Sequence, residues 1–189
     1  MHASICDFLT DIVQNSFEAA SSEVRLTIEQ TEDFFDFIVQ DNGKGMTIDH
    51  LKRALDPFFS DGTKHKKRKV GLGLPFLKQM IEAIDGEFSI SSEKGKGTIV
   101  SCKIPLSHID TPPLGDIPST FSTLFSYPST AEMIINRSAT RAGKREEYEV
   151  SKGELLEVLQ EVTRVSEMML MKTFLQSQEA AIEELLERV

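Results

Sequence analysis

Two neighbouring segments of the chain alternate apolar and polar side chains, and this alternation restricts the possible folds more than any other feature of the sequence. In residues 23–30, Val24, Leu26 and Ile28 alternate with charged or polar residues, and in residues 34–40, Phe35, Phe37 and Val39 alternate with polar or apolar neighbours. Alternation with a period of two places the apolar side chains on one face of a β-strand. The sequence therefore predicts a sheet with one buried face and one face in water.

Further elements complete one fold in roughly the first 106 residues. Residues 87–92 and 98–105 are expected to be strands, and helical spacing covers about residues 1–22, 47–56 and 72–84. An antiparallel or mixed sheet with one apolar face needs helices to cover that face. We predict an α/β (α+β) two-layer sandwich over residues 1–106, with a mixed, mostly antiparallel sheet covered by helices on one side.

The remainder of the chain is expected to divide into a connection and a C-terminal region. Residues 107–125 are rich in Pro, Ser and Thr and predict a linker. Residues 126–189 predict a β-hairpin, with strands near 131–140 and 145–150, followed by a helical segment from Ser151 to the end. The apolar stripe of that segment fits packing against the hairpin or sandwich, or a surface for a partner protein or a second copy of the chain.

Composition and charge argue against several classes of protein, among them nucleic-acid-binding and membrane-spanning proteins. The 189 residues carry a formal net charge of −9, and the only basic run is Lys64 with residues 66–69. An acidic chain with one short cationic loop is a poor nucleic-acid binder but can hold one small polyanion. No apolar run is long enough for a membrane span, and the widely separated Cys6 and Cys102 are expected to be reduced, buried thiols of a cytoplasmic protein. The histidines form no metal-binding pair.

The first predicted helix carries polar residues at helical spacing. Asp11, Asn15 and Glu18 are four and three residues apart and therefore share one face. An amide oxygen can bind Mg²⁺, and a carboxylate one turn away can position or deprotonate water. A solvated polar stripe is the simpler alternative.

The segment from Asp41 to Met46 (Asp-Asn-Gly-Lys-Gly-Met) directly follows a predicted strand. Gly43 and Gly45 permit a tight turn and the close approach of a flat ligand to the backbone. Asp41 can accept a hydrogen bond from an exocyclic amine such as that of adenine. The expected helix after the turn argues against an ordinary hairpin.

Two further segments favour phosphate binding. Residues 57–64 (Pro-Phe-Phe-Ser-Asp-Gly-Thr-Lys) combine a glycine with the start of the basic run, which can close over phosphates. Residues 71–74 (Gly-Leu-Gly-Leu) open a predicted helix, whose N-terminus favours an anion. Neither a Walker loop nor a dinucleotide-binding fingerprint is present.

Together these segments resemble the N, first glycine, F and second glycine boxes of the GHKL superfamily, the histidine-kinase-like ATPases with the Bergerat fold. Thr98, after Gly97, resembles the closing Gly-Thr element, and the resemblance covers about residues 4–106. It implies ATP and Mg²⁺ as cofactors, with Asn15 binding Mg²⁺ and Asp41 binding the adenine amine. It implies further ATP-binding residues in the base pocket and in a lid over the phosphates: Gly43, Gly45, Met46, Phe58, Lys64, Lys69, Gly71, Leu72, Gly73, Leu74 and Thr98.

Within the superfamily the motifs divide. Residues 57–59, 71–74 and 83–87 resemble histidine-kinase catalytic domains, whereas residues 11–19 resemble the hydrolysing members. Those carry a Glu as general base four residues before the Asn. Asp11 occupies this position and is one methylene shorter. The resemblance to histidine kinases also implies a histidine-bearing helical hairpin upstream, for which this sequence leaves no room, so autophosphorylation on histidine is not expected.

Three functions remain open at this point. The first is an ATP-dependent module that couples nucleotide binding or γ-phosphate hydrolysis to a change in its C-terminal region, with Asp11 as base and Lys64 or Lys69 as phosphate clamp. The second is a kinase of a partner protein, resembling the serine-kinase anti-sigma factors. The third is a non-catalytic ATP or ADP sensor.

Overall fold

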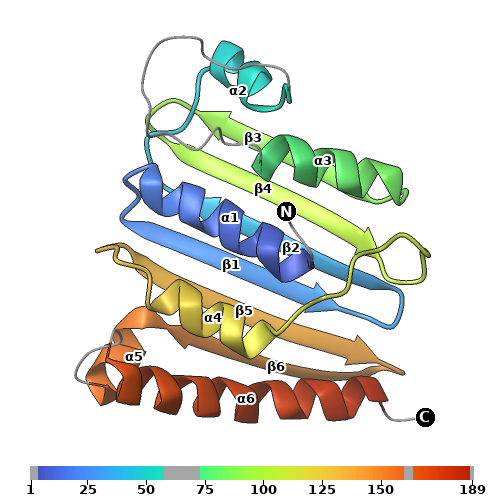
Figure 1. Cartoon of the computed structure of the whole chain (residues 1–189), viewed down its shortest axis with the longest axis vertical. Helices are drawn as coiled ribbons and strands as arrows, with labels where there is room; N and C mark the ends of the chain where they lie inside the picture. The colour runs from blue at the N-terminus through green and yellow to red at the C-terminus, as the bar shows by residue number, and fades with distance from the viewer. Residues whose placement is uncertain (1–3, 58–72, 160–163, 188–189) are drawn as a thin grey trace.

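A computed structural model describes residues 4–57, 73–159 and 164–187. Its elements, in chain order, are α1 (Ile5–Glu18), β1 (Glu23–Gln30), β2 (Phe34–Asp41), α2 (Ile48–Ala54), α3 (Gly73–Ala83), β3 (Glu87–Glu93), β4 (Gly97–Pro105), α4 (Ile117–Phe125), β5 (Glu132–Arg141), β6 (Lys144–Ser151), α5 (Lys152–Val158) and α6 (Val165–Glu187). The strands form a single mixed sheet, and α1, α3, α4 and α6 lie on the same side of it (Figure 1). This two-layer α/β arrangement confirms the predicted fold class.

The six strands follow the order β3-β4-β2-β1-β5-β6. Neighbouring strands are antiparallel except β1 and β5, which are parallel, with Leu26 opposite Ile135 in the register. β1 therefore joins the two halves of the sheet: the first four strands lie on one side of the β1–β5 contact and the C-terminal hairpin on the other. The hairpin is part of the same sheet as the first 106 residues.

The predicted alternation explains which face of the sheet is covered. On β1 and β2 every second side chain is buried, among them Leu26, Ile28, Phe35 and Phe37, each with at most 1% of its surface exposed. The helices contribute the opposite side of this core, including Leu9 of α1 and Ile81 of α3. The other face of the sheet bears the intervening residues, and no helix in the described residues covers it. We call it the open face.

The linker expected over residues 107–125 requires correction in its second half, where the structure has α4. Asp116 caps this helix by accepting a hydrogen bond from the Ser119 N–H at 2.9 Å, and Pro118 lies in the first turn. Four apolar residues on one stripe are buried against α1 and α6: Ile117, Phe121, Leu124 and Phe125. Their burial outweighs the low helix propensity of the Pro, Ser and Thr residues around them.

The continuous C-terminal helix expected from Ser151 is also corrected. α5 begins with the predicted capping box of Ser151 and Glu154 but ends at Val158, and α6 is a separate element that begins at Val165. The first helix is shorter than expected, since α1 ends at Glu18 and Ala20 adopts a φ of 58°.

A buried polar cluster ties α6 to the sheet. Arg137 of β5 donates from Nε to Glu179 of α6 at 3.2 Å and from its terminal nitrogens to Gln30 at 2.6 Å and the Ser138 carbonyl at 2.8 Å. The Tyr148 hydroxyl donates to the same Glu179 carboxylate. Arg137 and Glu179 are each 2% exposed, so the C-terminal helix is fixed to the sheet by an ion pair as well as by apolar packing.

Two other predictions concern the cysteines and membrane association. Cys6 and Cys102 are both free and buried, as expected, and burial raises the pKa of each thiol. Within the described ranges, no helix combines the length and the apolar character that crossing a bilayer requires.

Candidate nucleotide site

Asp41 lies at the end of β2 with its side chain on the helix-covered side of the sheet. Only 7% of the residue is exposed, and both carboxylate oxygens accept hydrogen bonds. The Gly43 N–H donates to Oδ1 at 2.8 Å and the Ser16 hydroxyl of α1 donates to Oδ2 at 3.0 Å. These donors fix the orientation of the carboxylate and leave lone pairs on both oxygens for a further donor.

The turn after Asp41 follows a path that only glycine allows. Gly45 has a φ of +56°, and a Cβ at this position would lie 2.0 Å from the Glu93 carbonyl oxygen. A Cβ at Gly43 would lie 2.8 Å from the Ala19 carbonyl oxygen. The segment is thus pressed between the end of α1 and the β3–β4 turn, which explains why the sequence places two glycines here.

A second network holds the turn to the edge of the sheet. Ser92 of β3 accepts a hydrogen bond from the Met46 N–H at 2.8 Å and donates to the Gly97 carbonyl at 3.0 Å. Its Oγ also lies 2.9 Å from the Thr98 hydroxyl. Since the single Ser92 proton is used by Gly97, Thr98 acts as the donor in that pair. Met46 and Thr98, which the sequence predicts to be site residues, are therefore linked through one serine.

These elements enclose a cavity of about 710 Å³ between α1, α2, the start of α3 and β4. Apolar side chains form its walls, and an amide, carboxylates and a lysine are distributed around them. The lining residues are Ile12, Asn15, Ser16, Glu18, Ala19, Asp41, Lys44, Gly45, Met46, His50, Ala54, Leu74, Thr98 and Val100. A concave, partly apolar cavity of this size with a few fixed polar groups is typical of small-molecule sites.

Most of the described candidate residues converge on this cavity. Asn15, Asp41, Gly45, Met46, Leu74 and Thr98 line it, and Gly43 lies in the turn below it, where its N–H orients Asp41. Asp11 and Gly73 do not belong to the lining. They lie close together where α1 meets the start of α3, because a Cβ on Gly73 would lie 3.1 Å from a carboxylate oxygen of Asp11.

The remaining candidates lie outside the described residues. These are Phe58, Lys64, Lys69, Gly71 and Leu72, all within residues 58–72. Their proposed roles over the phosphates stay predictions.

The sequence reasoning missed Ser16, Ser92, Lys44 and His50. Ser16 could have been found, because it is a polar residue on the apolar side of α1, next to Ile12 in the helical stripe. Ser92 could not, because its role depends on the register that places it opposite Thr98 across β3 and β4. Lys44 and His50 line the cavity from the turn and from α2.

The site offers few groups to a metal. No cluster of three or more His, Cys, Asp or Glu side chains able to hold an ion occurs in the part of the chain that the structure describes. Asn15 and Glu18, both on α1, bring an amide and a carboxylate to the cavity. Such a sparse set fits Mg²⁺, which keeps several waters and is commonly held together with substrate phosphates.

Comparison with known proteins identifies the family of the chain. The sequence profile of the histidine kinase-, DNA gyrase B- and HSP90-like ATPases matches residues 3–108, more than half of the chain. The chain belongs to this family. The members of this ATPase family share the nucleotide-binding domain, so residues 3–108 form a histidine-kinase-like ATP-binding module, as the sequence motifs predicted.

Individual relatives are named as kinases. A probable C4-dicarboxylate sensor kinase of Bacillus subtilis is 34% identical over 104 residues, covering 52% of this chain and 19% of the relative. Sporulation kinase C of the same organism is 34% identical over 98 residues, covering 51% and 22%. The chain thus spans about a fifth of the length of these curated relatives.

Among solved structures, the catalytic domain of histidine kinase ThkA matches with a TM-score of 0.41 and 23% identity. The match covers 56% of this chain and 66% of that structure.

Proposed function

We propose that the chain binds Mg·ATP in the cavity beside Asp41 and uses the nucleotide for γ-phosphate chemistry. The observation that carries this proposal is the geometry of the Asp41 carboxylate, which is buried, oriented by two donors and directed at the cavity. A buried carboxylate that faces a cavity favours a ligand with a hydrogen-bond donor, and the exocyclic amine of adenine is one. Met46, Val100 and Leu74 supply apolar contacts for the ring.

We place the phosphates towards α1 and the start of α3. Asn15 would bind Mg²⁺ directly or through its waters, and Glu18 and Lys44 also line the cavity. The start of α3 lies next to α1, because a Cβ on Gly73 would lie 3.1 Å from an Asp11 carboxylate oxygen, and a helix N-terminus favours an anion. Lys64, Lys69, Phe58, Gly71 and Leu72 are proposed to close over the phosphates, and Gly73 and Leu74 to bind them at the helix start.

Asp11 is the proposed base. It lies one helical turn before Asn15 and beside the first residue of α3, where the phosphates would end. This position allows it to orient water for hydrolysis or the hydroxyl of a partner protein for phosphotransfer. The likeness to sensor kinases supports transfer, whereas the hydrolysing-type motif of α1 supports an ATPase; a nucleotide sensor is the third outcome.

The C-terminal region is proposed to bind a partner protein or a second copy of the chain in response to nucleotide. α6 is anchored to the sheet on one side and exposes Met169, Leu170 and Phe174 on the other, with 67%, 59% and 42% of their surfaces accessible. We also propose a cytoplasmic location, which the two free, buried thiols support.

Binding is tested by titration calorimetry of Mg·ATP with Asp41→Asn. This change keeps the shape of the side chain but removes the charge of the acceptor, so affinity is expected to fall by about tenfold or more. Asp33→Asn, just before the other end of the same strand, is the matched control and should bind like the parent. Equal affinity of both variants would show that adenine does not bind at Asp41.

The chemistry is tested with γ-labelled ATP, Mg²⁺ and the Asp11→Asn variant. Release of free phosphate by the parent but not by the variant supports hydrolysis. Transfer of label to an added candidate partner supports a protein kinase. Tight binding without either reaction supports the sensor.

A further inference from the structure

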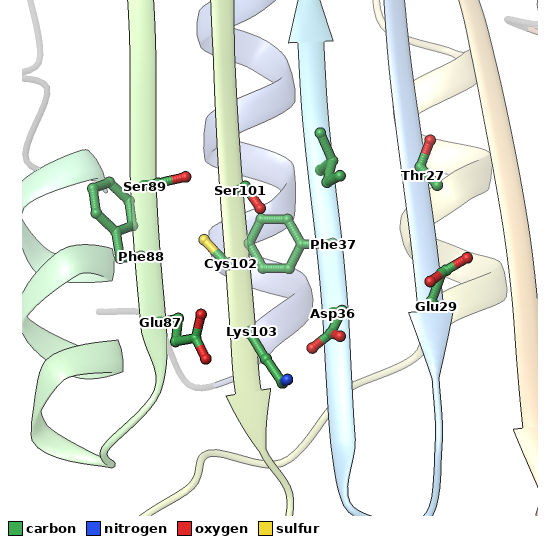
Figure 2. Close-up of a pocket in the computed structure, with 11 residues that line it drawn as sticks. Thr27, Glu29, Asp36, Phe37, Glu87, Phe88, Ser89, Ser101, Cys102 and Lys103 are labelled. Atoms are coloured by element: carbon green, nitrogen blue, oxygen red, sulfur yellow. The ribbon is translucent and has the colours of Figure 1, made fainter.

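The open face of the sheet contains a second concave region, unrelated to the nucleotide cavity. It has a volume of about 440 Å³ and is bordered by side chains of β1, β2, β3 and β4 (Figure 2). The helices lie behind the strands in this view, so the region is on the face of the sheet that these helices do not cover.

One row of charged residues crosses this region. The register places Glu29 opposite Asp36, Asp36 opposite Lys103, and Lys103 opposite Glu87, so that three carboxylates and one ammonium group lie side by side on four adjacent strands. Lys103 Nζ lies 4.5 Å from the centre of the Phe34 ring, and Glu29 also pairs with Arg145 at 3.5 Å. The row carries an excess of negative charge.

Asp36 is the group whose hydrogen bonding is incomplete. Its Oδ1 atom is buried and accepts no hydrogen bond from any described residue. Burial also raises the pKa of this carboxyl; Lys103 opposes the shift, and Glu29 and Glu87 add to it. Buried polar atoms in folded proteins nearly always have a partner, and this acceptor beside the concave region can take a hydrogen bond from a donor that a ligand brings.

Apolar side chains surround this acceptor. On β2, Phe34 and Ile38 flank Asp36 on the same face, with 36% and 41% of their surfaces exposed. Ile99 of β4, 41% exposed, lies diagonally from Ile38, because Ile38 is opposite Ser101. The exposed apolar side chains therefore extend along two central strands beyond the concave region.

We propose that the open face docks a segment of a partner protein that places a Lys or Arg side chain on Asp36 and apolar side chains on Ile38 and Ile99. A cationic donor satisfies the buried oxygen and balances the excess of carboxylates, and the apolar contacts cover the flanking residues. The same charge opposes nucleic acid and anionic membrane surfaces. This inference is independent of the nucleotide site.

The test uses the full chain and a phage-displayed library of random 12-residue peptides, followed by calorimetry with a synthetic peptide of the selected consensus. We expect the consensus to contain Lys or Arg near apolar residues. Its affinity should fall at least tenfold with Asp36→Asn and with Ile38→Ser. Asp85→Asn removes the same charge at the end of α3 and should change affinity less than twofold. Ile38 and Asp85 are exposed, and Asp36→Asn keeps the size of the side chain. Thermal unfolding checks that each variant is folded.

Four results of the peptide experiment would overturn the proposal. They are a failure to select any peptide, a consensus without basic residues, equal binding by the parent and Asp36→Asn, and an equal loss with Asp85→Asn. Self-association of the parent that Asp36→Asn abolishes would identify a second copy as the occupant and would also overturn it.

Discussion

Asp36 and Asp41 lie on the same strand, five residues apart, and their side chains therefore face opposite sides of the sheet. Asp41 has two donors, whereas the buried oxygen of Asp36 has none in the described structure. The two carboxylates on this strand therefore have different surroundings. Asp41 accepts two hydrogen bonds, whereas burial raises the pKa of Asp36 and so disfavours its charged form.

Replacing Asp36 with Asn should raise the melting temperature at neutral pH. The pKa of Asp36 is raised in the folded protein, so its ionised form destabilises the fold at pH values above that pKa. As the pH falls through the raised pKa towards the ordinary value of 3.8, the carboxyl becomes protonated and the penalty disappears. The gain from Asp36→Asn should therefore shrink with acidification, as measured by thermal unfolding at a series of pH values. A gain that is constant with pH would contradict this.

Replacing Gly45 with Ala should destabilise the protein and weaken Mg·ATP binding. The new Cβ would lie 2.0 Å from the Glu93 carbonyl oxygen, at a φ of +56°. Gly95 is a matched control, because its φ is +83° but a Cβ there would have no atom within 4 Å. Gly95→Ala should lose only the conformational cost of about 1 to 2 kcal/mol, and Gly45→Ala more, in urea unfolding. Equal losses would show that the turn can move away from β3.

The sequence allowed some residues of the site to be predicted and not others. Asn15, Asp41, Met46 and Thr98 stand in motifs with recognisable spacing, and all four line the cavity. Ser92 stands in no motif, because its contacts depend on which residues face each other across β3 and β4. The register between β3 and β4 cannot be deduced from the residues next to Ser92 in the sequence.

At the scale of elements, the attachment of α6 depends on the Arg137–Glu179 pair. Arg137→Met would leave the Glu179 carboxylate buried without its counter-ion, and we expect a loss of about 3 to 5 kcal/mol in unfolding free energy. The double variant Arg137→Met/Glu179→Leu should lose less than the sum of the single changes. Lys78→Met removes one partner of an exposed pair with Glu82 on α3 and should cost less than about 0.5 kcal/mol. A small loss with Arg137→Met would show that water reaches the pair.

Helices and strands could be predicted where the apolar residues recur with one clear period along the sequence. The strand expected at residues 23–30 coincides with β1, and β2 extends only one residue beyond the prediction. α4 was missed, although Ile117, Phe121 and Leu124 have helical spacing, because the surrounding Pro, Ser and Thr residues indicate a loop. Its helical structure depends on tertiary burial, which local composition does not report.

At the scale of the whole molecule, the parallel contact between β1 and β5 could not be predicted. Each strand was recognised, but nothing in either segment specifies the other as its neighbour. The contact makes the C-terminal hairpin a continuation of the sheet that carries the nucleotide cavity. The stacking of Phe17 on Tyr127, with ring centroids 5.0 Å apart, connects the two halves a second time through the helix layer.

A fragment of residues 1–106 should consequently be less stable than the full chain. It lacks β5 and leaves the buried face of β1 without Met133 and Ile135, so it should melt at a lower temperature or aggregate. A fragment of residues 1–159 retains β5 and β6 and should lie between the two. Thermal unfolding and size-exclusion chromatography distinguish them. A fragment 1–106 that melts like the full chain would show that β1 needs no such neighbour.

The same contact has a consequence for synthesis on the ribosome. Glu23 and its partner Glu132 are separated by more than a hundred residues, whereas β1, β2 and β4 follow one another early in the chain. The strands that carry the nucleotide cavity leave the ribosome first and can form hydrogen bonds with one another. At that stage the backbone groups of β1 that later bond to β5 still have no partner strand. Until β5 has been synthesised, this exposed edge of β1 can form hydrogen bonds with other proteins. Binding of a nucleotide to the partly folded chain would stabilise the strands already formed and so limit such aggregation.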